Sequence, residues 1–225
     1  MKKNILILLV VATVIFNACD KKNPCPDNIN GGSQTLNFPS KLFFPYPKQV
    51  VTIILKNAKN DSLKIKTDNQ QYDIVQLNDT LLCGDGIDPF LSQFQYHTSE
   101  NIRHVWTGNN ANTSVTALVQ LFVENARVKD SAFYDKLSVR TTLNNVTSGF
   151  DFITDTRGKS ISMAYTDLIN KYRFVADTTW SNKNFKNVYY SVDNKINQSA
   201  IFYNRQFGIV GLRIADEMWV FDRFE

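Results

Sequence analysis

The chain has 225 residues, of which 43% are hydrophobic, 12% aromatic and 20% charged. Its 25 basic and 21 acidic residues leave a formal net charge of +4, which is too small to indicate nucleic acid or an acidic substrate as the partner. Only three cysteines and two histidines are present, so thiol and imidazole chemistry is limited to few positions.

The chain begins with the features of a secretory signal. Lys2 and Lys3 provide the positive start, and residues 5–16 form an apolar run of suitable length. A membrane-spanning helix needs ~20 apolar residues, so this run is too short to span. No later stretch is apolar enough to span either, and we expect a water-soluble body after export. Loss of the two lysines would leave 23 basic and 21 acidic residues, a net charge of +2.

A cysteine follows the apolar run. Residues 15–19 read Ile-Phe-Asn-Ala-Cys, which resembles the box of a bacterial lipoprotein signal that is cut before a lipidated cysteine. The resemblance implies that residues 1–18 are the signal peptide and that Cys19 carries the acyl chains. Each buried methylene of those chains would contribute ~0.8 kcal/mol to membrane attachment. The alternative is an ordinary signal peptide cut near Ala18, with Cys19 left as a thiol.

Residues 19–35 contain many Asp, Asn, Pro and Gly residues and one isolated aliphatic side chain, Ile29. Such a composition cannot build a core, so we expect a flexible tether. Residues 36–225 have the length of a single domain, or of two subdomains that divide near residues 100–112.

Cys25 and Cys83 remain as a pair if Cys19 is lipidated. Exported proteins occupy compartments that permit disulfides. A bridge between the two would close a loop of 58 residues, which is worth roughly 4 kcal/mol in the chain-entropy model. The alternative is two free thiols, because the distance that a bridge requires cannot be tested from the sequence.

Three segments in the first two thirds of the chain have the patterns of β-strands. Residues 50–55 form a continuous aliphatic, largely β-branched run, as in a buried strand. Residues 113–123 and 137–143 alternate with a period of two. Leu118 and Phe122 lie on the even positions of the first alternating segment, so we expect its second face to be partly covered.

Two helices are also predicted. Asp88 and Pro89 suit the N-cap and the first position of a helix over residues 89–97. A second helix is predicted from four apolar residues at helical spacing: Ile161, Tyr165, Leu168 and Tyr172.

Short aromatic or β-branched runs, separated by turn residues, fill the last third of the chain. The runs cover residues 171–180, 185–192, 199–204, 208–214 and 218–224. Such punctuation is typical of antiparallel hairpins. The predicted fold is therefore mainly β, an antiparallel meander that forms a sandwich or half-barrel with one or two short helices.

The sharpest candidate for a metal site is His97, Glu100 and His104. In a helix the spacings of three and four would place all three on one face, where they could hold zinc with an open position for water. The intervening Thr, Ser and Asn residues are weak helix formers. The simpler interpretation is two ordinary histidines, so no metal or other cofactor is predicted.

Other chemistry has less support. Asp85 and Asp88 resemble a fragment of a calcium loop, but the acidic repeat stops there, and a capped turn explains the same residues. The chain contains no Gly-x-Ser-x-Gly nucleophile motif and no glycine-rich phosphate loop. Nothing in the sequence singles out a pair of catalytic carboxylates, which would be assembled in space.

A short pattern of Asp, then Ser or Thr, then usually an apolar residue recurs along the chain. It resembles the O-glycosylation site of the Bacteroidetes envelope, where a sugar adds bulk and solubility at exposed turns. The same pairs are also common in turns for local hydrogen-bonding reasons. The four candidate acceptors are Ser62, Thr80, Ser131 and Thr178.

The C-terminal segment resembles the closing hairpins of envelope lipoproteins from the Bacteroidetes. The matching residues are Asn187-Val188-Tyr189, Tyr203-Asn204, Gly208-Ile209-Val210-Gly211, and Glu217 with Trp219. The resemblance covers about the last 40 residues and implies an envelope address and a β-rich body, without a particular activity.

These features predict a non-enzymatic lipoprotein that is held at the outer membrane and has a binding or structural role, with a protein, glycan or lipid as partner. A second hypothesis is a carrier whose curved sheet encloses a lipid or other apolar ligand, which requires an apolar cavity. A third is an envelope hydrolase, which requires polar side chains that converge in a cleft.

Overall fold

The computed structural model describes residues 27–67, 70–83, 93–110, 113–126, 132–158, 171–191 and 199–225. Contacts between residues divide the chain into two compact units. Unit 2, the larger, consists of residues 32–77 and 98–225. Unit 1 contains the described residues 27–31, 78–83 and 93–97.

Strands make up most of the described chain, as the sequence predicts. The first elements are β1 (Ile29–Gln34), α2 (Phe38–Lys41), β2 (Thr52–Lys56), β3 (Ser62–Thr67), β4 (Gln71–Cys83), β5 (Gln93–Asn110) and β6 (Thr113–Ala126). They are followed by β7 (Ala132–Leu143), β8 (Val146–Asp155), β9 (Tyr172–Trp180), β10 (Lys183–Ser191), β11 (Ala200–Asn204), β12 (Gly208–Ile214) and β13 (Glu217–Phe224).

The strands form one antiparallel sheet. Its order is β8-β7-β6-β5-β3-β2-β13-β12-β11-β10-β9, and β1 and β4 also pair with β5. Most neighbours in the sheet are also neighbours in the sequence, which confirms the predicted meander. Three pairings are non-local: β1 and β3 each pair with β5, and β13 pairs with β2.

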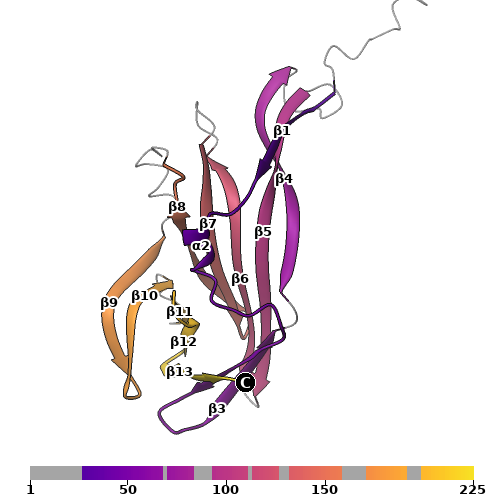
Figure 1. The fold of residues 1–225 in the computed structure, drawn as a ribbon. Coiled ribbons are helices and arrows are strands. Elements are labelled where there is room, and N and C mark those ends of the chain that lie inside the picture. Colours follow the sequence, from indigo (N-terminus) through magenta and orange to yellow (C-terminus); the bar gives the residue numbers. More distant parts are fainter. Residues whose placement is uncertain are drawn as a thin grey trace, which may run out of the picture. The chain divides into compact units, whose positions relative to one another are not determined.

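The sheet of unit 2 curls until its two ends meet. Figure 1 shows β9 to β13 across from β5 to β8. At the junction the ring of Phe152 in β8 stacks on Tyr189 in β10, with 4.6 Å between ring centroids. The Ser148 hydroxyl donates a hydrogen bond to Ser191 Oγ over 2.8 Å. The half-barrel alternative therefore describes this unit.

Strand β6 shows how the sequence pattern produces the core. Its odd positions from Val115 to Val123 are at most 1% exposed, as their alternation predicts. Leu118 and Phe122, on the other face, are half-buried, which confirms that this face is partly covered. The hairpin from β7 to β8 turns at Asn144 and Asn145, both with positive φ, as a type I′ turn requires.

The two predicted helices are not supported by the described residues. Residues 93–97 belong to β5 and Tyr172 begins β9; residues 84–92 and 159–170 lie outside the described residues. The helix that the structure does describe, α2, has four residues and Pro39 near its start. Pairing with neighbouring strands overrides the local helix signal in β5, because strand propensity depends strongly on tertiary context.

The predicted tether is also too long. Residues 29–34, inside the expected tether, form β1 and pair with β5. Most of the side chains of β1 are exposed, so this strand is held through its backbone. Because its side chains are exposed, β1 does not need alternating apolar residues. Its sequence therefore looks like that of a tether.

Gly208 opens β12 in a left-handed conformation, with φ of 75°. A Cβ atom at this position would lie 2.2 Å from the hydroxyl oxygen of Tyr46. The same hydroxyl accepts a hydrogen bond of 2.8 Å from the backbone N–H of Ile209. Glycine at position 208 therefore permits the backbone of β12 to approach Tyr46.

We expect Gly208→Ala to lower the free energy of unfolding by about 3 kcal/mol, because it adds a steric clash to the strain of a positive φ. Gly158→Ala is the matched control, since Gly158 has φ of 70° and open space around its missing side chain. This control should cost only about 1 kcal/mol. Urea unfolding of both variants measures the difference, and equal losses would contradict the proposed clash.

Candidate functional site

The segment from residue 34 to residue 46, called the strap below, packs against the inner face of the unit 2 sheet. Leu36, Phe44 and Tyr46 from this segment belong to the buried core. Phe43 is half-buried, and its ring lies edge-on to that of Phe152, with 5.4 Å between centroids. The strap therefore supplies part of the core that the strands alone lack.

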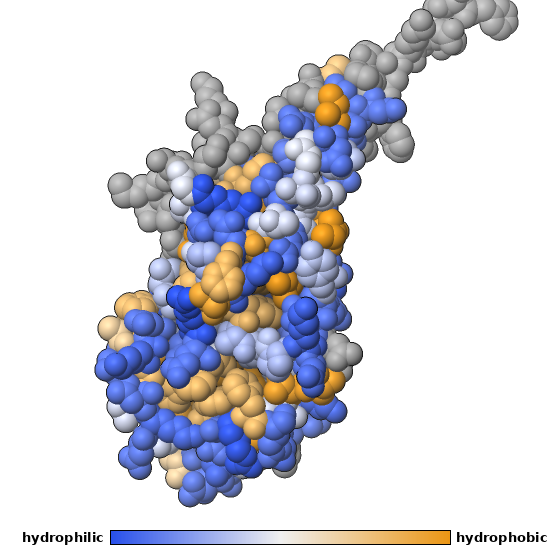
Figure 2. Space-filling view, in the orientation of Figure 1, coloured by the Kyte–Doolittle hydropathy of each residue, from blue (hydrophilic) through white to orange (hydrophobic). Residues whose placement is uncertain are grey.

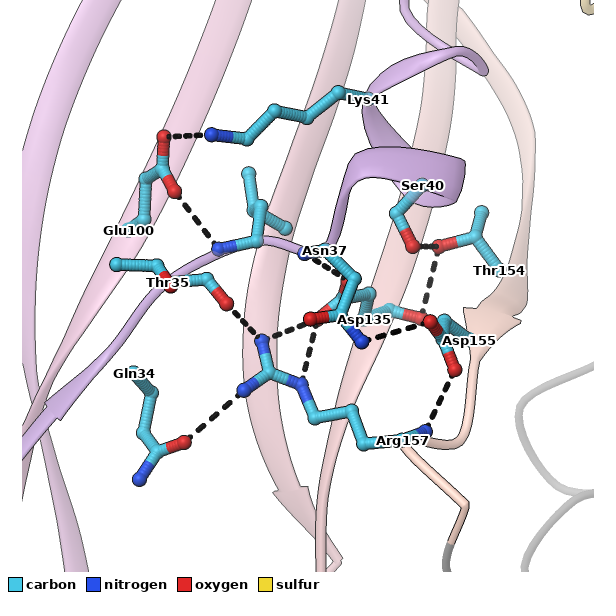
Figure 3. A network of polar contacts seen from close by, with 11 residues as sticks. Gln34, Thr35, Asn37, Ser40, Lys41, Glu100, Asp135, Thr154, Asp155 and Arg157 are labelled. Carbon is cyan, nitrogen blue, oxygen red and sulfur yellow. Dashed lines mark hydrogen bonds and ion pairs between the residues drawn. The ribbon is translucent and has the colours of Figure 1, made fainter.

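Carboxylates from three different strands hold the first half of the strap (Figure 3). Glu100 in β5 accepts a hydrogen bond of 2.7 Å from the backbone N–H of Leu36. Asp135 in β7 accepts one of 2.8 Å from the backbone N–H of Asn37. Asp155 in β8 accepts one of 2.8 Å from the side-chain amide of Asn37.

Two cations complete this network. Arg157 Nε donates to Asp135 over 2.9 Å, and its other guanidinium nitrogens donate to the Gln34 side chain and to the Thr35 carbonyl. Lys41 Nζ forms an ion pair of 2.9 Å with Glu100. Asp135 is fully buried, and a buried carboxylate is stable only when it is paired and hydrogen-bonded. We interpret this network as a structural tie.

Buried tyrosines attach the second half of the strap to β11 and β12. The Tyr203 hydroxyl donates a hydrogen bond to the Phe43 carbonyl, and the Tyr46 hydroxyl accepts one from Ile209 N–H. Burial raises the pKa of both tyrosines well above the ordinary value, so both hydroxyls stay protonated. The strap thus links the two sides of the curled sheet.

The structure does not assemble the candidate metal site. His97, Glu100 and His104 lie in strand β5 rather than in a helix, and a strand places residues 100 and 104 on one face and residue 97 on the other. Glu100 is engaged with the strap. In the described ranges of the chain, no cluster of His, Cys, Asp and Glu side chains is suited to hold a metal ion.

His104 instead occupies an aromatic box. Its ring stacks on Tyr46 with centroids 5.5 Å apart and also contacts Phe44 and Trp106. The side chain is fully buried, and neither ring nitrogen has a hydrogen-bond partner among the described residues. Burial lowers the pKa of His104 to about 4, so the imidazole is neutral at physiological pH.

The other predicted sites lie partly outside the described residues. Cys83 is disulfide-bonded, but its partner is not among the described residues, and pairing with Cys25 stays a prediction. Cys19, Cys25, Ser131, Asp85 and Asp88 are outside the described residues, and nothing is described of the Thr80 side chain. Ser62 is exposed at the start of β3, whereas Thr178 is half-buried within β9. Glycosylation of either residue stays a prediction.

An open groove lies where three hairpin turns of unit 2 meet; we call it the turn groove. It consists of two adjoining pockets of about 520 and 830 Å³, which share Ala58, Ser181 and Val220. The turns are those between β2 and β3, between β9 and β10, and between β12 and β13. The apolar part of the lining is formed by Trp180, Ile214, Met218, Val220 and Phe221.

Hydrogen bonds hold the walls of the turn groove. The Asn57 side chain donates to Asp61 over 2.9 Å and to Glu217 over 2.7 Å, and it accepts from the backbone N–H of Asp61. It therefore joins the turn after β2 to the start of β13. Trp180 packs edge-on against Phe202 with ring centroids 5.0 Å apart. The groove is thus preformed.

Three charged groups at the turn groove, Lys183, Asp222 and Arg223, are engaged with one another. Lys183 Nζ donates to the Asp222 carboxylate over 2.8 Å and to the backbone carbonyls of Phe221 and Asp222. Arg223 also donates to Asp222, over 2.7 Å. The hydrogen bond from Lys183 is the main reason why the pKa of Asp222 is lowered. Asp222 therefore stays ionised and suits binding better than proton transfer.

The sequence does not single out Asp135, and it presents Glu100 only as a candidate metal ligand. Asp135 continues the odd register of Leu137 and Val139, and Glu100 shares the even register of Ile102 and His104. An acidic residue on the inward face of a strand requires a partner. The position of each carboxylate in the alternation of its strand therefore indicates that it is buried and paired.

Comparison with protein-family models, curated proteins and solved structures finds no match to this chain. Among the described residues, no helix has both the length and the apolar character needed to cross a membrane.

Replacement of a buried strap carboxylate should destabilise the protein strongly. We expect Asp135→Asn to lower the free energy of unfolding by about 3 kcal/mol, because it leaves Arg157 without its buried anion. Glu225→Gln makes the same chemical change at the exposed ion pair with Lys64 and should cost less than about 1 kcal/mol. Chemical denaturation at neutral pH provides the test, and similar losses would contradict the structural role of Asp135.

The buried His104 makes stability depend on pH. Its native pKa of about 4 lies below the unfolded value of 6.5, so the unfolded state binds more protons between these values. The free energy of unfolding should therefore fall by about 3 kcal/mol as pH decreases from 7 to 4, from this group alone. His104→Phe removes the titrating group, and the difference between the two proteins measures its effect. Parallel pH profiles would contradict the assignment.

Proposed function

We propose that the chain is a lipid-anchored protein of the cell envelope, held at the outer membrane, that binds a partner through the turn groove and catalyses no reaction. The observation that carries the binding role is the preformed groove, which combines an apolar floor around Trp180 with a rim of hydrogen-bonding side chains. Concave sites with apolar walls and a few fixed polar groups are typical of ligand binding.

The proposed anchor is Cys19. Its acyl chains would hold the protein on the membrane, and residues 19–28 would form the tether, because β1 begins at Ile29. Acylation of Cys19 would leave Cys25 as the partner of the disulfide-bonded Cys83, since the chain has three cysteines. That bridge would connect the tether to strand β4 close to the membrane attachment.

The groove favours binding over hydrolysis. A general acid or base works best when its pKa lies near the working pH. The hydrogen bond from Lys183 lowers the pKa of Asp222, at the groove, and so moves it further from the working pH. The carrier hypothesis receives less support than the groove, because Phe150, Phe152 and Phe43 pack inside the curled sheet where a carried lipid would have to lie.

Photo-crosslinking in intact cells tests the binding role of the turn groove. A photoreactive amino acid at Lys59 or Asp216, both exposed at the groove, should give one discrete adduct. The same probe at Arg173, exposed in β9, is the matched control and should give none. Equal adducts from all three positions, or none from the groove, would reject the groove as the binding site.

The anchor is measured in the same cells by incorporation of radiolabelled palmitate. Wild type should take up the label and fractionate with the outer membrane, whereas Cys19→Ala should remain unlabelled. Label retained by Cys19→Ala would refute the proposed attachment. Protease treatment of intact cells then distinguishes a surface address from a periplasmic one.

A further inference from the structure

A second pocket lies on unit 2, away from the three turns of the turn groove. It has a volume of about 650 Å³ and is called the cationic pocket below. Its lining contains three basic residues and no acidic residue: Lys41, Leu42, Phe44, Pro45, Lys186, Asn187, Arg205 and Gln206. It is formed by the strap, by β10 and by the turn between β11 and β12.

Two of the three cations lack an ion-pair partner among the described residues. Lys41 is paired with Glu100 at 2.9 Å. Lys186 and Arg205 form no ion pair with any part of the chain that the structure describes, although Asp177 is the cross-strand neighbour of Lys186. The guanidinium of Arg205 lies over the ring of Phe43, 5.4 Å from its centroid. Two cations of the lining are therefore left without a described ion-pair partner.

Buried hydrogen bonds fix the three segments that carry these groups. Asn204, which is 1% exposed, donates to the Lys186 carbonyl and accepts from Phe207 N–H. It thereby holds the turn of Arg205 against the segment of Lys186. Tyr203 donates to the Phe43 carbonyl, and Tyr46 accepts from Ile209 N–H, which attaches the strap to the same turn. The pocket is preorganised rather than assembled by a ligand.

The floor of the pocket is apolar. Leu42 is 38% exposed and Phe44 is 8% exposed, and Pro45 lies beside them in the lining. On the face drawn in Figure 2, hydrophobic residues border strongly hydrophilic ones across unit 2. A ligand that suits both parts of the pocket must be amphiphilic, with an anionic head and an apolar group next to it.

We propose that the cationic pocket binds the phosphate monoester of an amphiphile. A phosphate monoester carries a charge of about −1.5 to −2 at pH 7, which matches the two unpaired cations. Arginine presents a planar fork that bonds two phosphate oxygens, and lysine adds a point charge. Leu42, Phe44 and Pro45 then cover the first carbons of the apolar group. This site is independent of the turn groove.

Calorimetric titration of the full-length protein in a neutral detergent tests the proposal, with hexyl phosphate as the probe. Hexyl sulfate has the same chain with one charge fewer, and inorganic phosphate lacks the chain. Hexyl phosphate should bind about tenfold more tightly than either control compound, because hexyl sulfate loses part of the charge interaction and inorganic phosphate loses the apolar contact. Its affinity should fall with added potassium chloride. Equal binding of the three probes, or no binding, would overturn the proposal.

Variants locate the site. Arg205→Gln and Lys186→Gln should each weaken hexyl phosphate binding by about tenfold, because each removes a charged hydrogen-bond donor. Lys66→Gln removes an exposed cation in β3, outside the pocket, and should leave the affinity unchanged. Equal effects of the three substitutions would overturn the site and indicate a general charge effect. Urea unfolding of each variant checks that the fold is retained.

Vesicles distinguish the two sources of the phosphate. Phosphatidylcholine vesicles with and without phosphatidic acid are floated with the Cys19→Ala protein, which lacks the proposed anchor. Flotation that depends on phosphatidic acid and is competed by hexyl phosphate would identify a membrane headgroup. Hexyl phosphate binding without flotation would identify a free phosphoester. Flotation that persists in Arg205→Gln would contradict the assignment of this pocket.

Discussion

Carboxylates buried on the inner face of the sheet control the architecture of unit 2. Glu100 and Asp135 lie where an unpaired charge would cost several kcal/mol, and the strap supplies their backbone donors. In return the strap contributes Leu36, Phe44 and Tyr46 to the core. Strap and sheet therefore depend on each other. Without the strap the buried carboxylates lack their donors, and without the sheet the apolar side chains of the strap are not buried.

The β-structure could be predicted because its signals are local. The alternation of residues 113–123 and the turn between the runs 171–180 and 185–192 follow from neighbouring residues, and both are present. The strap network could not be predicted in the same way, since Leu36 and Glu100 are 64 residues apart and Asn37 and Asp155 are 118 apart. The candidate metal site is not assembled, because its three residues at helical spacing lie in a strand.

The turn groove and the cationic pocket are stabilised in the same way. Asn57 fixes the turns of one, and Asn204 fixes the segments of the other, in each case by bonding the side-chain amide to groups from two elements. Their ligand preferences differ because the charges differ. At the turn groove Lys183 and Arg223 pair with Asp222, whereas Lys186 and Arg205 have no ion-pair partner among the described residues.

The pairing of β13 with β2 has a consequence for the life of the chain before it folds. Strand β2 cannot complete its partners until residues 217–224 have been synthesised, and contacts of such long sequence separation form slowly. The sheet therefore cannot close until the end of the chain is available. For a protein that is exported as proposed, this delay is useful, because a translocation channel accepts an unfolded chain and the sheet can close on the far side.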